Sequence, residues 1–172
     1  MIIQTEWTER KFNFDFPSGL FPNIIERLRG TPVRVEELIK DVPDEALTAR
    51  IENKWSIQEH IGHLISVEAL WEHRLDQYRQ QVELLIAADM TNQATERADY
   101  NSQPLGEVLR RWRIARFAFV QRLEETPIEI VEQVALHPRL NTAMRLVDLC
   151  YFAAEHDDHH LARMAALIRQ LR

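Results

Sequence analysis

Two histidines near the C-terminal end of the chain, His156 and His160, have the spacing of a metal-binding pair. In a helix, residues four apart lie one turn apart on the same face, so both imidazoles can bind one ion. Both also continue an apolar pattern through positions 146, 149, 153, 164, 167 and 171. Buried imidazoles are costly unless their nitrogens find partners, so the pattern indicates that something binds both rings.

A third ligand is needed to build a site on this pair. The helix expected after Ser56 offers three candidates, His60, His63 and His73. His63 is favoured because it lies beside the core-facing Leu64, close to a helix start that fixes its rotation about the axis. The metal site is therefore predicted to comprise His63, His156 and His160. Three neutral imidazoles suit a divalent ion such as Zn²⁺, Ni²⁺ or Fe²⁺, and they leave a coordination position open for an outside ligand.

These residues must be positioned by helices. Ser56-Ile57-Gln58-Glu59 forms a capping box, and apolar residues then recur at steps of three and four to near Ala88. Prolines, glycines and apolar spacing predict further helices from Pro22 to Gly30, Thr31 to Pro43, Ser102 to Pro127, and Asn141 almost to the chain end.

The segments between these helices lack a helical period. Residues 1–19 are expected to form an irregular arm and residues 89–101 a loop. Residues 128–136 suggest a short extended piece before a turn at His137-Pro138. The predicted fold is an all-α four-helix bundle formed by residues 20–172, with the N-terminal arm, as a single domain over residues 1–172.

Composition excludes several classes of protein. The formal charge of -6 argues against nucleic acid as a partner, and we interpret the cluster Arg110, Arg111, Arg113 and Arg116 as a solvated helix face. No apolar run is long enough to span a membrane, so the protein is expected to be cytoplasmic, with no membrane partner. The single cysteine, Cys150, is expected to be buried and inert.

The other histidines are expected to lie outside the ligand set. His159 is displaced around the helix from His156, which suggests a supporting or solvent-facing role. His60 and His73 are expected to be partly exposed. His137 is expected to be a loop histidine, with an approach to the site entrance as the alternative.

Three acidic residues near the predicted site leave alternatives open. Glu68 occupies a place in the apolar pattern and needs a partner, either at the site or on an arginine. Asp157 and Asp158 either orient a ligand imidazole through its second nitrogen or are ordinary acids on an exposed helix face.

Several motifs resemble one known family. Trp55-Ser56 is followed by His63-Leu64, Glu68 and a late Glu155-His156-Asp157-Asp158-His159-His160-Leu161. This pattern is similar to the DinB/YfiT-like superfamily of four-helix metalloproteins, over roughly residues 28–168. The family's one histidine on the second helix and His-x-x-x-His on the fourth correspond to His63, His156 and His160.

The resemblance also implies possible activities. Characterised relatives include bacillithiol S-transferases and mycothiol-dependent maleylpyruvate isomerase. We therefore expect a metal-dependent thiol S-transferase or hydrolase that acts with a low-molecular-weight thiol or another small molecule. A homodimer is expected from the family and from surface aromatic residues, Trp112 and Phe117 among them.

The sequence is also compatible with two alternatives. The chain could be a non-enzymatic metal-binding stress or sensor protein, in which the ion ties two helices together. It could also be a bundle without a metal, provided that the histidines find hydrogen-bond partners.

Overall fold

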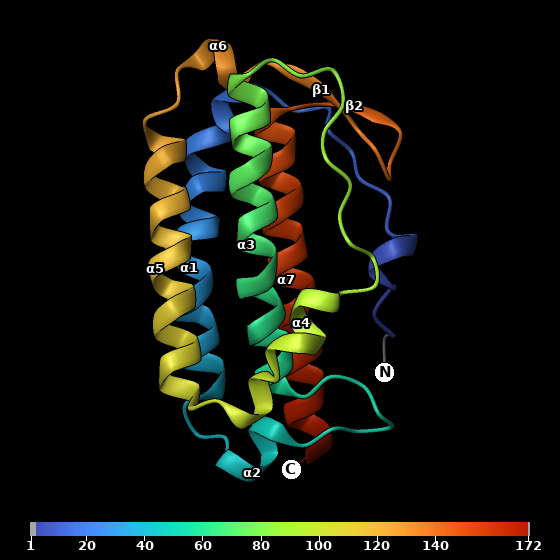
Figure 1. Cartoon of the computed structure of the whole chain (residues 1–172), viewed down its shortest axis with the longest axis vertical. Helices are drawn as coiled ribbons and strands as arrows, with labels where there is room; N and C mark the ends of the chain where they lie inside the picture. Colours follow the sequence, from blue (N-terminus) through green and yellow to red (C-terminus); the bar gives the residue numbers. More distant parts are fainter. Residues whose placement is uncertain (1–2, 172) are drawn as a thin grey trace.

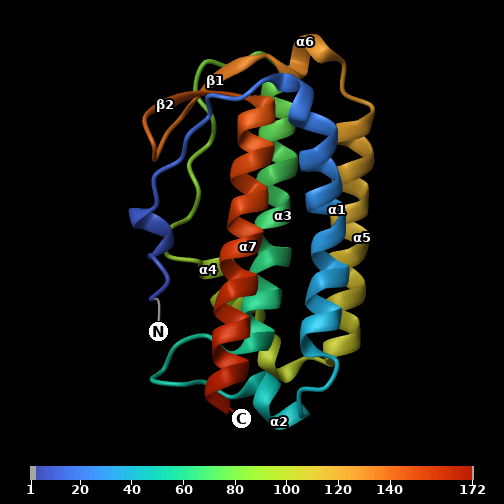
Figure 2. The ribbon, with the colours of Figure 1, turned by 180° about the vertical axis from the view of Figure 1, so that it is seen from behind.

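Four long helices form an elongated bundle in the computed structural model, which describes residues 3–171 (Figure 1). They are α1 (Phe21–Ile39), α3 (Ile57–Arg79), α5 (Leu105–Glu124) and α7 (Leu146–Leu171). Helices α1 and α3 each pack against both α5 and α7, so α1 and α3 lie diagonally across the bundle (Figure 2). The predicted all-α four-helix bundle is confirmed.

Short elements connect and cover the bundle. The arm contains the 3-10 turns η1 (Trp7–Glu9) and η2 (Ser18–Leu20), and the connections contain α2 (Asp44–Thr48), α4 (Gln93–Ala98), η3 (Tyr100–Ser102) and α6 (Ile128–Val131). Strands β1 (Val134–His137) and β2 (Thr142–Arg145) form an antiparallel hairpin at one end. No helix among residues 3–171 combines the length and the apolar character that crossing a membrane requires.

The core consists of two apolar clusters stacked along the bundle. The first core cluster contains Trp71 of α3 and Leu149 and Phe152 of α7. The second core cluster contains Leu64 of α3 and Met164 of α7. On α7 the predicted ligands His156 and His160 fall between the two clusters, whereas His63 of α3 lies beside Leu64, within the second cluster. The bundle therefore places these histidines at the boundary of the two apolar regions.

The expected break at Gly30 to Pro32 is wrong, because α1 continues through Pro32. Proline lacks an N–H and normally leaves the carbonyl four residues earlier without its helical donor. Here Arg116 Nη1 donates to that carbonyl, Leu28 O, at 3.1 Å. A contact from another helix therefore replaces the bond that Pro32 cannot make.

Helix α3 begins at the predicted capping box but ends at Arg79, not near Ala88. Gln81 has a left-handed backbone (φ 57°), after which the chain runs extended. The Leu85 amide donates to Leu136 O at 3.0 Å, so this segment pairs with β1. The apolar side chains there enter the core from an extended segment, which is why their spacing suggested more helix.

Other element boundaries also differ from the prediction. The loop expected at residues 89–101 contains α4 and η3, and the expected extended piece at residues 128–136 begins with α6 and becomes extended only in β1. The last helix begins at Leu146 because residues 142–145 form β2. In the arm, aromatic side chains pack against the first core cluster: Trp7, Phe12, Phe14 and Phe16.

Gly62 packs directly against the ring of Tyr100, and a Cβ there would overlap that ring. Tyr100 is buried, and its hydroxyl lies 3.0 Å from Ser66 Oγ, which restricts its movement. We expect Gly62→Ala to lower the free energy of unfolding by about 1–3 kcal/mol, measured by denaturant titration.

Gly30→Ala is the matched control, since Gly30 is also inside a long helix and a Cβ there meets nothing within 4 Å. It should raise the free energy of unfolding by up to about 1 kcal/mol. A stabilising effect of Gly62→Ala would contradict the packing described for Tyr100.

Candidate metal centre

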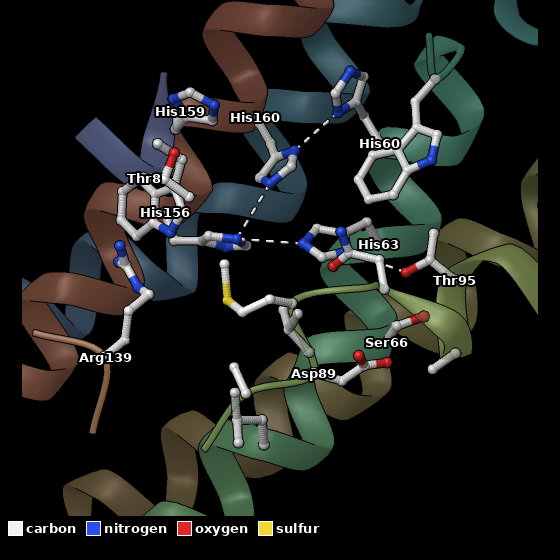
Figure 3. Close-up of a pocket in the computed structure, with 18 of the residues that line it drawn as sticks. Thr8, His60, His63, Ser66, Asp89, Thr95, Arg139, His156, His159 and His160 are labelled. Atoms are coloured by element: carbon white, nitrogen blue, oxygen red, sulfur yellow. Dashed lines mark hydrogen bonds between the residues drawn. The ribbon is translucent and has the colours of Figure 1, made fainter. Parts of the chain in front are cut away.

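The three predicted ligands converge in the middle of the bundle, His63 from α3 and His156 and His160 from α7 (Figure 3). We call these three residues the histidine triad. Nε2 of His156 lies 3.3 Å from Nε2 of His63 and 3.2 Å from Nε2 of His160, and ligand nitrogens of all three lie within 4.8 Å of one another. Two nitrogens bound to a tetrahedral zinc ion lie about 3.3 Å apart. The donor types and their spacing therefore fit a divalent ion.

Burial keeps the triad neutral. All three rings are buried, and desolvation lowers the pKa of His63 to about 4. Desolvation also holds the pKa of His156 and that of His160 well below the usual value, and the neighbouring histidines lower both further. Near pH 7 each ring then has a free nitrogen lone pair, which is the form that binds a metal ion.

Two of the three rings are oriented through their second nitrogen. Nδ1 of His63 lies 3.1 Å from Thr95 Oγ1, and Nδ1 of His160 lies 2.9 Å from Nδ1 of His60. Such contacts fix the ring orientation of metal-binding histidines. Nδ1 of His156 is buried and has no hydrogen-bond partner among residues 3–171. Thr95 was missed in the sequence because it lies in α4, where a loop was expected.

A cavity of about 950 Å³ adjoins the triad, and all three histidines line it. Its walls come from the arm, the loop before α3, the segment around α4, the hairpin, and helices α3 and α7. Trp55 and Trp7 flank the triad, with ring centroids 4.8 Å from His63 and 5.1 Å from His156. A small molecule in this cavity can therefore reach the side of the triad where the Nε2 atoms meet.

The family of the chain follows from its sequence. The model of the DinB superfamily matches residues 27–164, which is most of the chain. The chain belongs to the DinB superfamily. The resemblance seen in its histidine and tryptophan motifs is thereby confirmed.

One solved structure supports the fold of this DinB superfamily member. The chain is similar to YfiT from Bacillus subtilis, described as a probable metal-dependent hydrolase with an unusual four-helix bundle topology. The two share 16% sequence identity with a TM-score of 0.80, and the match covers 95% of this chain and 94% of that chain. No curated protein sequence matches this chain.

The remaining histidines lie at different places in this DinB bundle. His60 is half-buried beside the triad and His73 is exposed. His159 lies outside the triad, with Nδ1 3.0 Å from Gln4 Nε2, and it lines the cavity. The expectation of a plain loop histidine at His137 is wrong, because it is buried at the end of β1 and also lines the cavity.

Two of the three acidic residues, Glu68 and Asp157, belong to a buried ionic cluster that is separate from the triad. Glu68 and Asp157 both form ion pairs with Arg116, and all three side chains are almost fully buried. Thr31 Oγ1 donates to Asp157 at 2.9 Å, and the Trp112 indole donates to Glu68 at 3.1 Å. Glu68 therefore has an arginine partner, as one alternative proposed, whereas neither alternative for Asp157 is correct.

The structure corrects the expectations for Arg116, Trp112 and Asp158. Arg116 does not belong to a solvated face, because it is the counter-ion of this buried cluster. Trp112 is fully buried and so cannot contribute to a homodimer surface, while Phe117 is 38% exposed. Asp158 is half-buried and pairs with Arg27 and Arg34 instead of orienting an imidazole.

The buried histidines make the metal-free protein sensitive to acid. Desolvation lowers the pKa to about 4 for His63, His137 and His159, compared with about 6.5 in an unfolded chain. Between these values the unfolded chain binds more protons, so stability is full above about pH 6.5 and falls toward pH 4. We expect the Tm of metal-free protein to fall by at least about 5 °C from pH 7 to pH 5.

Calorimetric melts of His159→Gln and His73→Gln test this account. The first should reduce the pH dependence, and the second, which replaces an exposed histidine, should leave it unchanged. A pH-independent Tm would show that burial does not hold these imidazoles neutral.

Proposed function

We propose that the chain is a divalent-metal-dependent enzyme that hydrolyses a small molecule or transfers a thiol to it, with His63, His156 and His160 as the metal ligands. The observation that supports this most is a three-imidazole set on the wall of a 950 Å³ cavity. Structural zinc sites are normally closed by four protein ligands, whereas catalytic sites use three. The neighbouring His60 contacts Nδ1 of His160, not the Nε2 side, and so does not supply a fourth ligand.

A bound divalent ion would supply Lewis acidity that the side chains lack, and would make a water or a thiol a stronger nucleophile near neutral pH. His63, His156 and His160 would hold that ion. Thr95 and His60 orient two of these rings through their Nδ1 atoms. Zn²⁺, Ni²⁺ and Fe²⁺ all suit imidazole ligands.

The nucleophile has to come from outside the chain if it is a thiol. Cys150 is the only cysteine, lies fully buried in the first core cluster, and does not line the cavity. Burial raises the pKa of its thiol, which further suppresses the reactive thiolate. A thiol reaction would therefore use a low-molecular-weight thiol. The similarity to YfiT, described as a probable metal-dependent hydrolase, favours hydrolysis.

Turnover assays on metal-free and reloaded protein test the proposal. Chelator-treated protein is reloaded separately with Zn²⁺, Ni²⁺, Mn²⁺ or Fe²⁺. Hydrolysis is followed with an activated ester, and thiol transfer with an aryl halide plus cysteine or glutathione. We expect turnover that requires the ion, is lost in His63→Ala, and is retained in the matched control His73→Ala. Equal turnover with and without every ion would contradict the proposal.

A non-enzymatic role for the ion is the second candidate. It is favoured by one observation, namely that the triad joins α3 to α7 in the buried interior of the bundle. A structural ion predicts that His156→Ala, assayed in the presence of metal, has a much lower Tm. A catalytic ion allows the variant to lose turnover while it stays folded.

A further inference from the structure

The cavity is basic although the protein as a whole is acidic. Five basic residues line it, Arg50, Lys54, Arg74, Arg139 and Arg163, against three acidic ones, Glu6, Asp89 and Glu96. The formal charge of the whole chain is -6. Basic residues attract anions where carboxylates do not already neutralise them, so the partners of these five residues decide which of them can bind a ligand.

Three of the five basic residues form ion pairs with carboxylates. The pairs are Arg50 with Glu59, Lys54 with Glu52 at 3.2 Å, and Arg163 with Glu6 at 2.6 Å. Arg74 and Arg139 form no ion pair with any carboxylate among residues 3–171. These two arginines are therefore the cations available to a ligand.

Arg74 is a buried cation with neutral partners. Its side chain is 1% exposed, and it donates to Ile86 O from Nη2 at 2.8 Å and from Nε at 3.2 Å. Its Nη1 lies 3.2 Å from Nε2 of His137. Burial lowers the pKa of Arg74 to about 10, which still leaves it charged near pH 7. A buried charge without a counter-ion is unfavourable, so a bound anion would stabilise it.

Arg139 and Trp71 line the same cavity, and each has an unused donor. Arg139 Nη2 and Trp71 Nε1 are buried and have no acceptor among residues 3–171. Both side chains pack on Phe152. The centroid of the Phe152 ring is 5.6 Å from the Arg139 guanidinium carbon and 6.3 Å from the centroid of the Trp71 ring. Figure 3 shows Arg139 beside His156 of the triad.

From these contacts we infer that Arg74, Arg139 and Trp71 form a subsite for an oxyanion group of the substrate, a carboxylate or a phosphate. A guanidinium binds either group through two parallel hydrogen bonds, and the indole N–H can donate to the same anion. The Trp71 and His156 ring centroids are 6.0 Å apart, so the subsite adjoins the triad. The substrate would then be a small anionic molecule in which only a few atoms separate the reacting bond from the charged group. This assignment rests on the proposed function.

Anion binding to metal-free protein tests the subsite without requiring turnover. Inorganic phosphate and succinate are titrated separately into the chelator-treated full chain by calorimetry, at pH 8 and constant ionic strength. Saturable binding is expected, and the tighter probe identifies which oxyanion the subsite prefers. Arg139→Gln should weaken binding about 10-fold or more. Trp71→Phe keeps the ring but removes the N–H, and it should weaken binding severalfold.

Arg163→Gln is the matched control, because it removes the same charge from the same cavity at an arginine already paired with Glu6. It should change the Kd by less than about 3-fold. The subsite is refuted if neither probe binds, or if Arg163→Gln weakens binding as much as Arg139→Gln does. An inactive protein that still binds the anion would refute only the proposed function, and an active one that does not bind it would refute only the subsite.

Discussion

Arg116→Met is expected to lower the free energy of unfolding by about 3–5 kcal/mol. Arg116 is fully buried, forms ion pairs with Glu68 and Asp157, and donates to Leu28 O. Without it, two carboxylates would remain buried with no counter-ion, and α1 would lose the donor that compensates for Pro32. Urea unfolding followed by circular dichroism measures the loss.

Two comparisons separate the lost charge pairing from other effects. Arg110→Met, on the same helix, breaks the exposed pair with Glu107 and should cost less than about 1 kcal/mol. Adding Glu68→Gln and Asp157→Asn to Arg116→Met should recover part of the stability, because no unpaired charge remains. A loss with Arg116→Met no larger than with Arg110→Met would show that the buried cluster does not hold the helices together.

His156→Ala is expected to weaken divalent-metal binding at least about 100-fold, more than is typical for the loss of a residue that only supports a ligand. His156 is the central member of the triad, since its Nε2 is close to the Nε2 of both partners. The metal-free protein should still fold. The substitution removes the Nε2 contacts, but the ring borders a cavity and its buried Nδ1 has no hydrogen-bond partner among residues 3–171 to lose. Competition with a chromophoric chelator gives the affinities.

His159→Ala is the control for this prediction. His159 is also buried on α7 and lines the same cavity, but its Nδ1 lies 3.0 Å from Gln4 Nε2, and its ring meets only the edge of His160, with the ring centroids 5.5 Å apart. It should change metal affinity by no more than about 3-fold, an effect well below that of removing a supporting residue. Equal losses in His156→Ala and His159→Ala would mean that the triad is not the binding site.

The members of the triad could be predicted from the sequence because helix phase and the resemblance to the family both indicate them. His156 and His160 share a face at any position of their helix, and the capping box at Ser56 and Glu59 is present with both of its hydrogen bonds. That box fixes where α3 begins and hence the side on which His63 lies. The end of α3 could not be read in the same way, because no glycine or proline marks the turn at Gln81.

The features that sequence reasoning missed depend on contacts between distant parts of the chain. Arg116 was interpreted as a surface residue because its neighbours are charged, yet its partners Glu68 and Asp157 are 48 and 41 residues away. Arg74 and His137 lie together although 63 residues separate them. Local spacing carries no information on such pairs. The cavity, and the two arginines in it that have no carboxylate partner within residues 3–171, could therefore be found only in the folded structure.

X-ray absorption spectroscopy of the zinc-loaded protein shows which atoms bind the ion. We expect one ion with three imidazole nitrogens at about 2.0–2.1 Å and at least one oxygen from a group outside the chain. A spectrum with a sulfur ligand, with four protein ligands, or with fewer than three imidazoles would contradict a three-histidine site that is open to substrate.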